Sequence, residues 1–308
     1  MKLRGAVVGV GYLGRFHAQK IKAHPDAELA GVCDFSYDQA QKVAGELATH
    51  AFKNPPELFG KVDFVHIAAS TQAHFDLAQL FLSQKIPVLV EKPIAATIEQ
   101  GEKLCLLAEA NSTLFTVGHI ERFNPAFKYL KENVQGIEYL EINRLAPFRT
   151  RGSDVSVLHD LMIHDIDLVS WIFDSEIATF TIAGQKLIKP TFDDVSVRLT
   201  LKNGTQVTIN NSRVTPEIIR SYRAVGNSKT IFMNTATLEG QVLVPLAGDP
   251  FYRIEEIKLE KVDTLALEVD HFIQCVLGRR KPAITAREAL KALVNVENFV
   301  SVLESQKT

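Results

Sequence analysis

The sequence predicts a doubly wound, parallel α/β domain followed by an α+β domain with a mainly antiparallel, open sheet. Up to about residue 118, continuous apolar runs alternate with segments of helical period, which is typical of a parallel sheet covered on both faces. Beyond that point, β-type segments follow one another with short turns. The length of 308 residues fits two domains at about 150 residues each. We therefore expect domains at residues 1–120 and 121–308.

The first domain should contain five strands joined by four helices. The strands are expected at residues 3–8, 29–33, 64–68, 88–90 and 114–117. The helices are expected at residues 13–23, 37–48, 73–83 and 98–110. Because each helix carries the chain back along the sheet, successive strands should run parallel.

The second domain should begin with a helix near Asn124-Pro125, a strand at 139–145 and a long apolar helix at 155–173. Strands joined by short turns should follow at residues 177–182, 195–201, 206–209, 222–225, 230–233 and 238–244. Asn203-Gly204 is a typical hairpin turn. Two closing helices are expected at residues 265–277 and 286–303. The second should start with a capping box formed by Thr285 and Glu288.

Charge and cysteine content restrict the partners. With 34 basic and 36 acidic side chains, the net charge of -2 gives no electrostatic drive toward nucleic acid or an anionic membrane. We therefore expect a small-molecule partner. Three scattered cysteines without a C-x-x-C pair argue against a disulfide framework or a zinc knuckle, and favour the cytoplasm. The apolar run after Lys2 is short and interrupted by glycine, so we do not interpret it as a secretory signal.

A glycine-rich string lies at the end of the first strand. In G-x-G-x-x-G, Gly9 can make the tight turn, Gly11 lets the backbone approach a pyrophosphate, and Gly14 permits close helix–sheet packing. Asp34 follows Gly14 by 34 − 14 = 20 residues and ends the second strand, where an acid receives ribose hydroxyls. Its carboxylate would repel a 2′-phosphate, which favours NAD over NADP. The alternative is a glycine-rich turn beside an exposed aspartate.

Glu91-Lys92-Pro93 directly follows the fourth strand, at the carboxyl edge where doubly wound sheets bind ligands. A lysine there can hold an alcohol or carbonyl oxygen by a charge-assisted hydrogen bond. The alternative is an ordinary surface lysine.

A polar stripe interrupts the long apolar helix. Asp160, His164 and Asp167 are spaced i, i+4 and i+7, which places them on one helix face. Such groups cost about 1–3 kcal/mol each when buried without partners, so the stripe should face a cleft or a paired network. A histidine near a carboxylate can accept a proton near neutral pH. The alternative is a core histidine with capping aspartates. A metal site is disfavoured, because His159 and His164 are five residues apart.

Five segments together carry a family resemblance. They are GVGYLGRFHA, EKP, VGHIERFNP, DLMIHDID and GRRKPAITAREAL, in this order along nearly the whole chain. With them the sequence resembles the Gfo/Idh/MocA family of NAD(P)-dependent dehydrogenases. The chain departs from the family at Met162, where glycine is usual, and at Asp165, where an apolar residue is frequent.

The resemblance implies roles for particular residues. The catalytic group would be Lys92, Asp160 and His164. The cofactor would be held by Gly9, Gly11, Tyr12, Leu13, Gly14, Asp34, Ser70, Thr71, His74, Glu91 and Lys92. The implied reaction is hydride transfer between a sugar-type secondary alcohol and the nicotinamide. His164 would remove the hydroxyl proton, Lys92 would orient the oxygen, and Asp160 would fix the imidazole, with the lysine and the histidine on opposite sides of one hydroxyl.

The substrate is suggested by the resemblance alone. The segments around residues 117–125 and 160–167 are similar to a branch that oxidises nucleotide-linked amino sugars, such as UDP-N-acetylglucosamine at C3. Arg122 and Asn124 would then contact the substrate, as His164 does; alternatively Arg122 forms an interdomain ion pair and Asn124 caps a helix. A dehydrogenase of free sugars or inositols and a non-catalytic NAD-binding sensor remain alternatives. We expect a homo-oligomer, a dimer or a tetramer, whose subunits pack sheet to sheet. We expect no metal ion.

Overall fold

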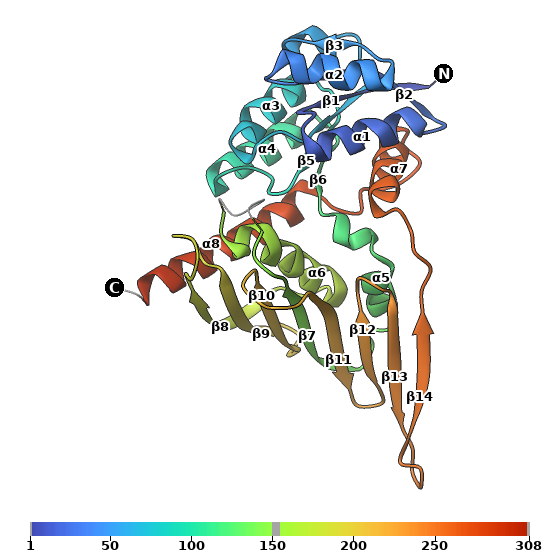
Figure 1. The fold of residues 1–308 in the computed structure, drawn as a ribbon, viewed down its shortest axis with the longest axis vertical. Coiled ribbons are helices and arrows are strands. Elements are labelled where there is room, and N and C mark those ends of the chain that lie inside the picture. The colour runs from blue at the N-terminus through green and yellow to red at the C-terminus, as the bar shows by residue number, and fades with distance from the viewer. Residues whose placement is uncertain (1, 150–154, 307–308) are drawn as a thin grey trace. The chain divides into compact units, whose positions relative to one another are not determined.

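The structure is a computed structural model that describes residues 2–149 and 155–306. The chain divides into two compact units. The first contains Met1–Ile120 and Asp263–Leu293, and the second contains Glu121–Val262 and Val294–Thr308. Each has its own sheet (Figure 1). The predicted fold class is confirmed: a parallel doubly wound sheet is followed by a mostly antiparallel one.

The sheet of the first unit has six strands in the order β3-β2-β1-β4-β5-β6, and all neighbours are parallel. The strands are β1 (Leu3–Val8), β2 (Ala27–Cys33), β3 (Ala51–Phe52), β4 (Phe64–Ile67), β5 (Val88–Glu91) and β6 (Phe115–Gly118). The five predicted strands agree within two residues at each end. The sequence did not predict β3, because two residues are too few to show a period.

The helices between these strands begin at clear signals. They are α1 (Tyr12–Ala23), α2 (Tyr37–Leu47), α3 (Thr71–Ser83) and α4 (Ile98–Ala110), with a short 3₁₀ helix at Pro55–Leu58. The Ser36 side chain accepts a hydrogen bond from the Gln39 N–H at the start of α2, and Thr97 does the same for Gln100 at α4. Both caps satisfy N–H groups that the first helical turn leaves unpaired.

Helix α7 (Thr264–Val276) belongs to the first unit, although the sequence places it in the second domain. Its buried residues Val269, Phe272 and Ile273 join the core that α1 and α2 form on one face of the first sheet. The Phe272 ring lies 5.7 Å from the Phe64 ring on β4. The predicted boundary after residue 120 coincides with the division, but residues 263–293 return to the first unit. Helical period identifies an apolar face without revealing which core it covers.

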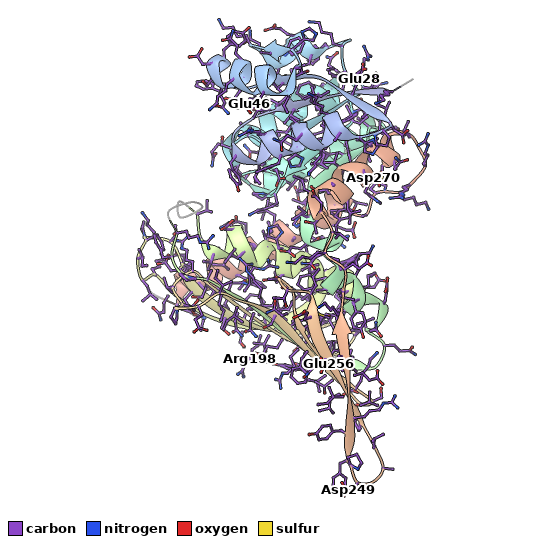
Figure 2. All side chains as sticks on the ribbon, turned by 45° about the vertical axis from the view of Figure 1, so that its right-hand side comes forward. Glu28, Glu46, Arg198, Asp249, Glu256 and Asp270 are labelled. Carbon is purple, nitrogen blue, oxygen red and sulfur yellow. The ribbon has the colours of Figure 1, made fainter. Side chains whose placement is uncertain are left out.

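The second unit has an eight-stranded sheet in the order β14-β13-β12-β11-β7-β10-β9-β8. The strands are β7 (Ile137–Leu145), β8 (Ile177–Gln185), β9 (Asp194–Leu201), β10 (Gln206–Ser212), β11 (Ile219–Gly226), β12 (Thr230–Asn234), β13 (Glu239–Pro245) and β14 (Tyr252–Lys258). Among the described strands of this sheet, β7 and β10 alone pair in parallel. Strand β14 was not predicted: it lies at the sheet edge and buries only Ile257, so its sequence lacks apolar alternation. Asp249 marks the tip of the β13–β14 hairpin (Figure 2).

Helices cover one face of this sheet (Figure 1). They are α5 (Pro125–Glu132), α6 (Ile163–Phe173) and the last part of α8 (Ala286–Ser305), with a 3₁₀ turn at Ile120–Phe123. The Tyr222 hydroxyl donates to the Ala126 carbonyl of α5 at 2.9 Å. The Phe180 and Phe299 rings join β8 to α8 at 4.6 Å. Arg198 lies on the other, uncovered face (Figure 2).

Two helix starts test the predictions. The Thr285–Glu288 capping box is confirmed, since the Thr285 N–H donates to Glu288 Oε2 at 2.8 Å and the Glu288 N–H donates to Thr285 Oγ1 at 3.2 Å. The long helix expected from residue 155 instead starts with a π-helical turn at Leu158–Met162, which runs into α6. No helix within residues 2–149 and 155–306 has the length and apolar character needed to cross a bilayer.

Candidate active site

The glycine-rich turn has the geometry that a dinucleotide requires. Gly9 has φ +85°, and a Cβ there would lie 2.6 Å from the Ala69 backbone. A Cβ at Gly14 would lie 1.8 Å from the Gly9 carbonyl oxygen. At Gly11, by contrast, a Cβ would meet no described atom within 4 Å. The fold itself therefore requires Gly9 and Gly14, whereas Gly11 leaves open space through which a ligand can approach the backbone.

The start of α1 is open in the same place. Gly11 is the N-cap residue, and no described side chain caps the helix there. Tyr12 and Leu13, the first helical residues, are 65% and 41% exposed. N–H groups and the helix dipole at such an end attract a phosphate. The turn therefore fits the pyrophosphate of a dinucleotide.

Asp34 lies beside this turn at the end of β2. Its Oδ2 accepts from the Val10 N–H at 2.8 Å, and its Oδ1 accepts from the Ser36 N–H at 2.9 Å. Gln39 adds a third link by donating to the Val10 carbonyl at 2.8 Å. The half-exposed carboxylate thus holds the turn and retains lone pairs that can accept from ribose hydroxyls.

His74 differs from the other residues expected at the cofactor. Its Nδ1 lies 2.8 Å from the Pro93 carbonyl oxygen, and its Nε2 lies 3.2 Å from that of Ala69. Burial lowers the pKa of His74 despite these two acceptors, which favours a neutral ring. Ser70 and Thr71 lie just before and at the start of α3. The buried His74 therefore ties the loop before α3 to the Lys92-Pro93 segment.

Glu91 is the last residue of β5 and Lys92 follows it, and the Lys92–Pro93 peptide bond is cis. Glu91 Oε1 lies 2.8 Å from His17 Nε2, while its Oε2 accepts from the Lys92 N–H at 3.3 Å. Burial alone would raise the pKa of Glu91, but the His17 hydrogen bond and the Lys92 charge outweigh burial and keep that pKa below its usual value. The carboxylate therefore holds the backbone at the predicted catalytic lysine.

Sequence reasoning missed the buried partners of Glu91. His17 lies in the quoted GRFHA run, but nothing in that run pointed to Glu91. His66 on β4 places its Nδ1 3.0 Å from His17 Nδ1. Glu268 on α7 could have been noticed, because it is one turn before Phe272 and next to Val269 in an apolar helix face.

The predicted base and its carboxylate lie in the second unit. Asp160 is in the π-helical turn, and His164 is in the first turn of α6; both are partly exposed. π-helical turns are rare and are frequent at functional sites. Lys92 belongs to the first unit. The action of all three on one substrate stays a prediction.

Asp167, the third residue of the polar stripe, is a structural ion-pair partner. Its two oxygens accept from Arg122 Nε at 2.8 Å and Nη2 at 2.7 Å. Both side chains are almost completely buried. Arg122 therefore forms an ion pair within the second unit.

Asn124 caps α5, because its Oδ1 accepts from the Ala126 N–H at 3.0 Å. Its amide nitrogen also contacts Glu121 Oε2 at 3.1 Å and the Thr235 carbonyl at 3.3 Å. For Arg122 and Asn124 the contacts thus match the structural alternative, except that the Arg122 pair is not interdomain. A substrate role for either residue stays a prediction.

Asp165, where the family frequently has an apolar residue, has a charged partner on β7. Its fully buried carboxylate accepts from Arg144 Nη2 at 2.7 Å and from Asn211 Nδ2 at 2.7 Å. Arg144 also pairs with Glu121 at 2.7 Å. Burial would lower the pKa of Arg144, but the two carboxylates raise it. This network fixes α6 on the sheet.

His159 belongs to another contact. Its Nε2 lies 2.8 Å from Glu297 Oε1 on α8. The side chain is therefore directed to the closing helix of the second unit, which agrees with its not sharing a face with His164.

An open glycine turn at a helix N-terminus, an acid after β2 and a lysine after β5 define the class: an NAD-binding oxidoreductase with a Rossmann fold. Residues 3–119 match the family model described as "Oxidoreductase family, NAD-binding Rossmann fold", and residues 140–232 match the "GFO/IDH/MocA C-terminal domain". The chain belongs to the Gfo/Idh/MocA family of oxidoreductases, and its activity is of the sugar-dehydrogenase type.

Several relatives are similar over the whole chain. UDP-N-acetylglucosamine 3-dehydrogenase of Acidithiobacillus ferrooxidans is 34% identical over 96% of this chain and 96% of that protein. The solved structure of that enzyme, GnnA, superposes with a TM-score of 0.92 at 31% identity, covering 99% of both chains. The NAD⁺-dependent scyllo-inositol 2-dehydrogenase of Bacillus subtilis is 25% identical over 99% of this chain and 94% of that protein.

Proposed function

We propose that this protein oxidises a secondary hydroxyl of a nucleotide-linked amino sugar with NAD, and that UDP-N-acetylglucosamine, oxidised at C3, is the first substrate to test. The observation that carries the proposal is the 34% identity along the whole chain to an enzyme with that name, against 25% for an inositol dehydrogenase. The open glycine turn with Asp34 supports a dinucleotide, and the Asp34 carboxylate favours NAD over NADP.

Each proposed catalytic residue has a defined task. NAD supplies the hydride acceptor when bound. Lys92 donates a charge-assisted hydrogen bond to the reacting oxygen, which orients it and stabilises developing negative charge. His164 accepts the hydroxyl proton, and the carboxylate of Asp160 fixes the orientation of the ring. Glu91 holds the Lys92 backbone through the 3.3 Å hydrogen bond.

The test is NADH formation by the purified protein, followed by absorbance, with UDP-N-acetylglucosamine, free N-acetylglucosamine and myo-inositol in parallel. We expect turnover with the nucleotide sugar at a kcat/KM at least about tenfold above the other two, a difference of about 1.4 kcal/mol in transition-state binding. A preference for inositol or the free sugar would contradict the proposed substrate and would leave the proposed reaction type unchanged. NAD binding without turnover on any alcohol would instead support the sensor alternative.

We also propose a homo-oligomer that covers the outer face of the second sheet. This face carries Phe232 and Ile254, which are 43% and 50% exposed. A shallow hollow of about 540 Å³, lined in part by Glu141, Arg223 and Phe232, lies on the same face. Exposed apolar side chains on one face of a sheet favour a symmetric partner.

A further inference from the structure

Four ionisable side chains meet inside the first unit, and the proposed mechanism gives a task to only one of them. They come from four elements: His17 on α1, His66 on β4, Glu91 at the end of β5 and Glu268 on α7. His17 and His66 are fully buried, and Glu268 is 3% exposed. Burying so many polar groups in one place is unfavourable unless they act together.

Hydrogen bonds link three of the four. A carboxylate only accepts, so His17 donates from Nε2 to Glu91 Oε1 at 2.8 Å. The second nitrogen of His17 lies 3.0 Å from His66 Nδ1. The His66 ring packs against the Phe64 and Phe272 rings at 5.6 and 5.1 Å. Burial, with the His17 charge as a smaller cause, puts the pKa of His66 well below its usual value, so this ring stays neutral.

Glu268 is the unexplained member. A ring nitrogen of His17, a carboxylate oxygen of Glu91 and a carboxylate oxygen of Glu268 lie within 4.8 Å of one another. Neither oxygen of Glu268 has a hydrogen-bond partner among the described residues. A second negative charge this close to Glu91, and without a donor, is strongly unfavourable in a buried site. Burial first, and the Glu91 charge second, raise the pKa of Glu268 well above its usual value.

A metal ion is the competing explanation for two carboxylates and a histidine. The distance between His17 and Glu91 argues against it. Ligand atoms about 2.0–2.1 Å from a tetrahedral zinc lie about 3.3 Å from one another. The 2.8 Å between His17 Nε2 and Glu91 Oε1 is instead a hydrogen-bond distance.

We propose that Glu268 is a positioning residue that keeps its proton at neutral pH. Of these two carboxyl groups, only Glu91, which accepts from the Lys92 N–H, then carries a negative charge. The proposal rests on the catalytic role given to Lys92 above. A neutral Glu268 leaves Glu91 free to accept from His17 and from the Lys92 N–H. An ionised Glu268 repels Glu91 and displaces the lysine that Glu91 holds.

Charged side chains that are close in sequence to His17 and Glu268 are already paired. Lys20 of α1 pairs with Asp263 at 2.5 Å, and His24, the C-cap residue of α1, pairs with Asp270 at 3.1 Å. The ionisable groups of this cluster on β4 and β5 are His66 and Glu91, and Lys92 follows Glu91. The electrostatic influence on Glu268 comes from Glu91.

The proton on Glu268 has a defined effect on stability. Because the pKa is higher in the folded than in the unfolded state, the folded state binds the extra proton above the usual value of 4.5. Stability contributed by this proton is full below that value and falls as pH rises toward the folded-state pKa. Over that interval the folding equilibrium constant drops about tenfold per pH unit. Glu268→Gln, a neutral isostere, removes this dependence.

The first experiment is urea unfolding of wild type and Glu268→Gln between pH 5 and 9. We expect the variant to gain stability relative to wild type as pH rises, by up to about tenfold in the equilibrium constant per pH unit. Glu102→Gln, at an exposed position of α4, is the matched control and should run parallel to wild type. Parallel curves for Glu268→Gln as well would overturn the proposal.

A second measurement does not depend on how the variant folds. The infrared spectrum of wild type at neutral pH should contain the carbonyl stretch of a protonated carboxylic acid, and this band should disappear at high pH. Absence of the band would overturn the proposal. So would stoichiometric zinc in purified wild type that is lost in Glu268→Gln.

Kinetics separate positioning from general stability. We expect kcat of wild type to decrease at alkaline pH, where Glu268 ionises, and we expect this decrease to be absent from Glu268→Gln. An unchanged alkaline decrease in the variant would contradict a positioning role. The unfolding and infrared measurements need no substrate. If wild type oxidises no sugar, the proposed function fails while the state of Glu268 is still decided.

Discussion

Asp34 and Gly11 take part in the same turn, but their constraints differ. Asp34 accepts two backbone hydrogen bonds, so its carboxylate contributes to the fold as well as to the expected ribose contact. A Cβ at Gly11 would have no atom of the described part of the chain within 4 Å, whereas a Cβ at Gly14 would have no room. A requirement for glycine at position 11 therefore arises only from a ligand.

Gly11→Ala should separate ligand binding from folding. The added methyl meets no atom of the described residues within 4 Å, so thermal stability should be unchanged. NAD should bind about 10- to 100-fold more weakly, because forcing a methyl group into a packed contact costs about 1–3 kcal/mol. Isothermal titration calorimetry checks the affinity. Gly45→Ala on α2, also open to 4 Å, is the control and should bind NAD normally.

His164→Ala tests the proposed base. Positioned proton transfer contributes about 10²- to 10⁴-fold to rate, so kcat should fall by such a factor while NAD affinity stays the same. Steady-state kinetics with the nucleotide sugar and calorimetry with NAD provide the two values. His159→Gln should remain active, because its amide can still donate to Glu297. Wild-type kcat in His164→Ala would exclude the histidine as base.

Among the elements, α7 marks the limit of what the sequence predicts. Its apolar period located the helix within one residue at each end, as it did for α4. The period could not reveal that the helix returns to the first unit and places Glu268 near Glu91. Motif spacing and the family resemblance likewise led to Lys92, Asp160 and His164, because these signals lie in local pattern, and the catalytic roles of the three residues stay predictions. Arg144, which fixes Asp165 from a strand 21 residues away, lies beyond any such pattern.

Asp167 lies in α6, one turn after His164. Its ion pair with Arg122 attaches α6 to the segment before α5. Asp167→Asn leaves a buried guanidinium without its counter-charge and should lower the free energy of unfolding by about 3–5 kcal/mol. Urea unfolding followed by circular dichroism measures this change.

Replacing both partners, Arg122→Met with Asp167→Leu, should restore most of the stability, because well-packed apolar residues can substitute for a buried ion pair. Glu176→Gln, which breaks the exposed Lys202–Glu176 pair, is the control and should change stability by less than about 1 kcal/mol. If Asp167→Asn costs no more than that control, the buried pair does not anchor α6.

At the scale of the whole molecule, the eight-stranded sheet presents a mixed outer face. Hydrogen-bonded polar residues occupy its middle, where Asn210 Nδ2 donates to Asn143 Oδ1 at 2.9 Å and Ser196 donates to Asn210 Oδ1 at 2.7 Å. Phe232 and Ile254 lie toward the β14 edge. An apolar area beside a polar one is typical of subunit interfaces, which combine an apolar core with a polar rim.

Phe232→Glu should therefore weaken self-association. We expect wild type to show the mass of a dimer or tetramer by multi-angle light scattering. The dissociation constant of the variant oligomer should be at least about tenfold higher than that of wild type, because a charge buried in an apolar contact costs more than about 1.4 kcal/mol. Leu106→Glu, at a 58% exposed position on α4, introduces the same charge elsewhere and should leave the mass unchanged. A monomeric wild type, or equal dissociation of both variants, would place no interface on this face of the sheet.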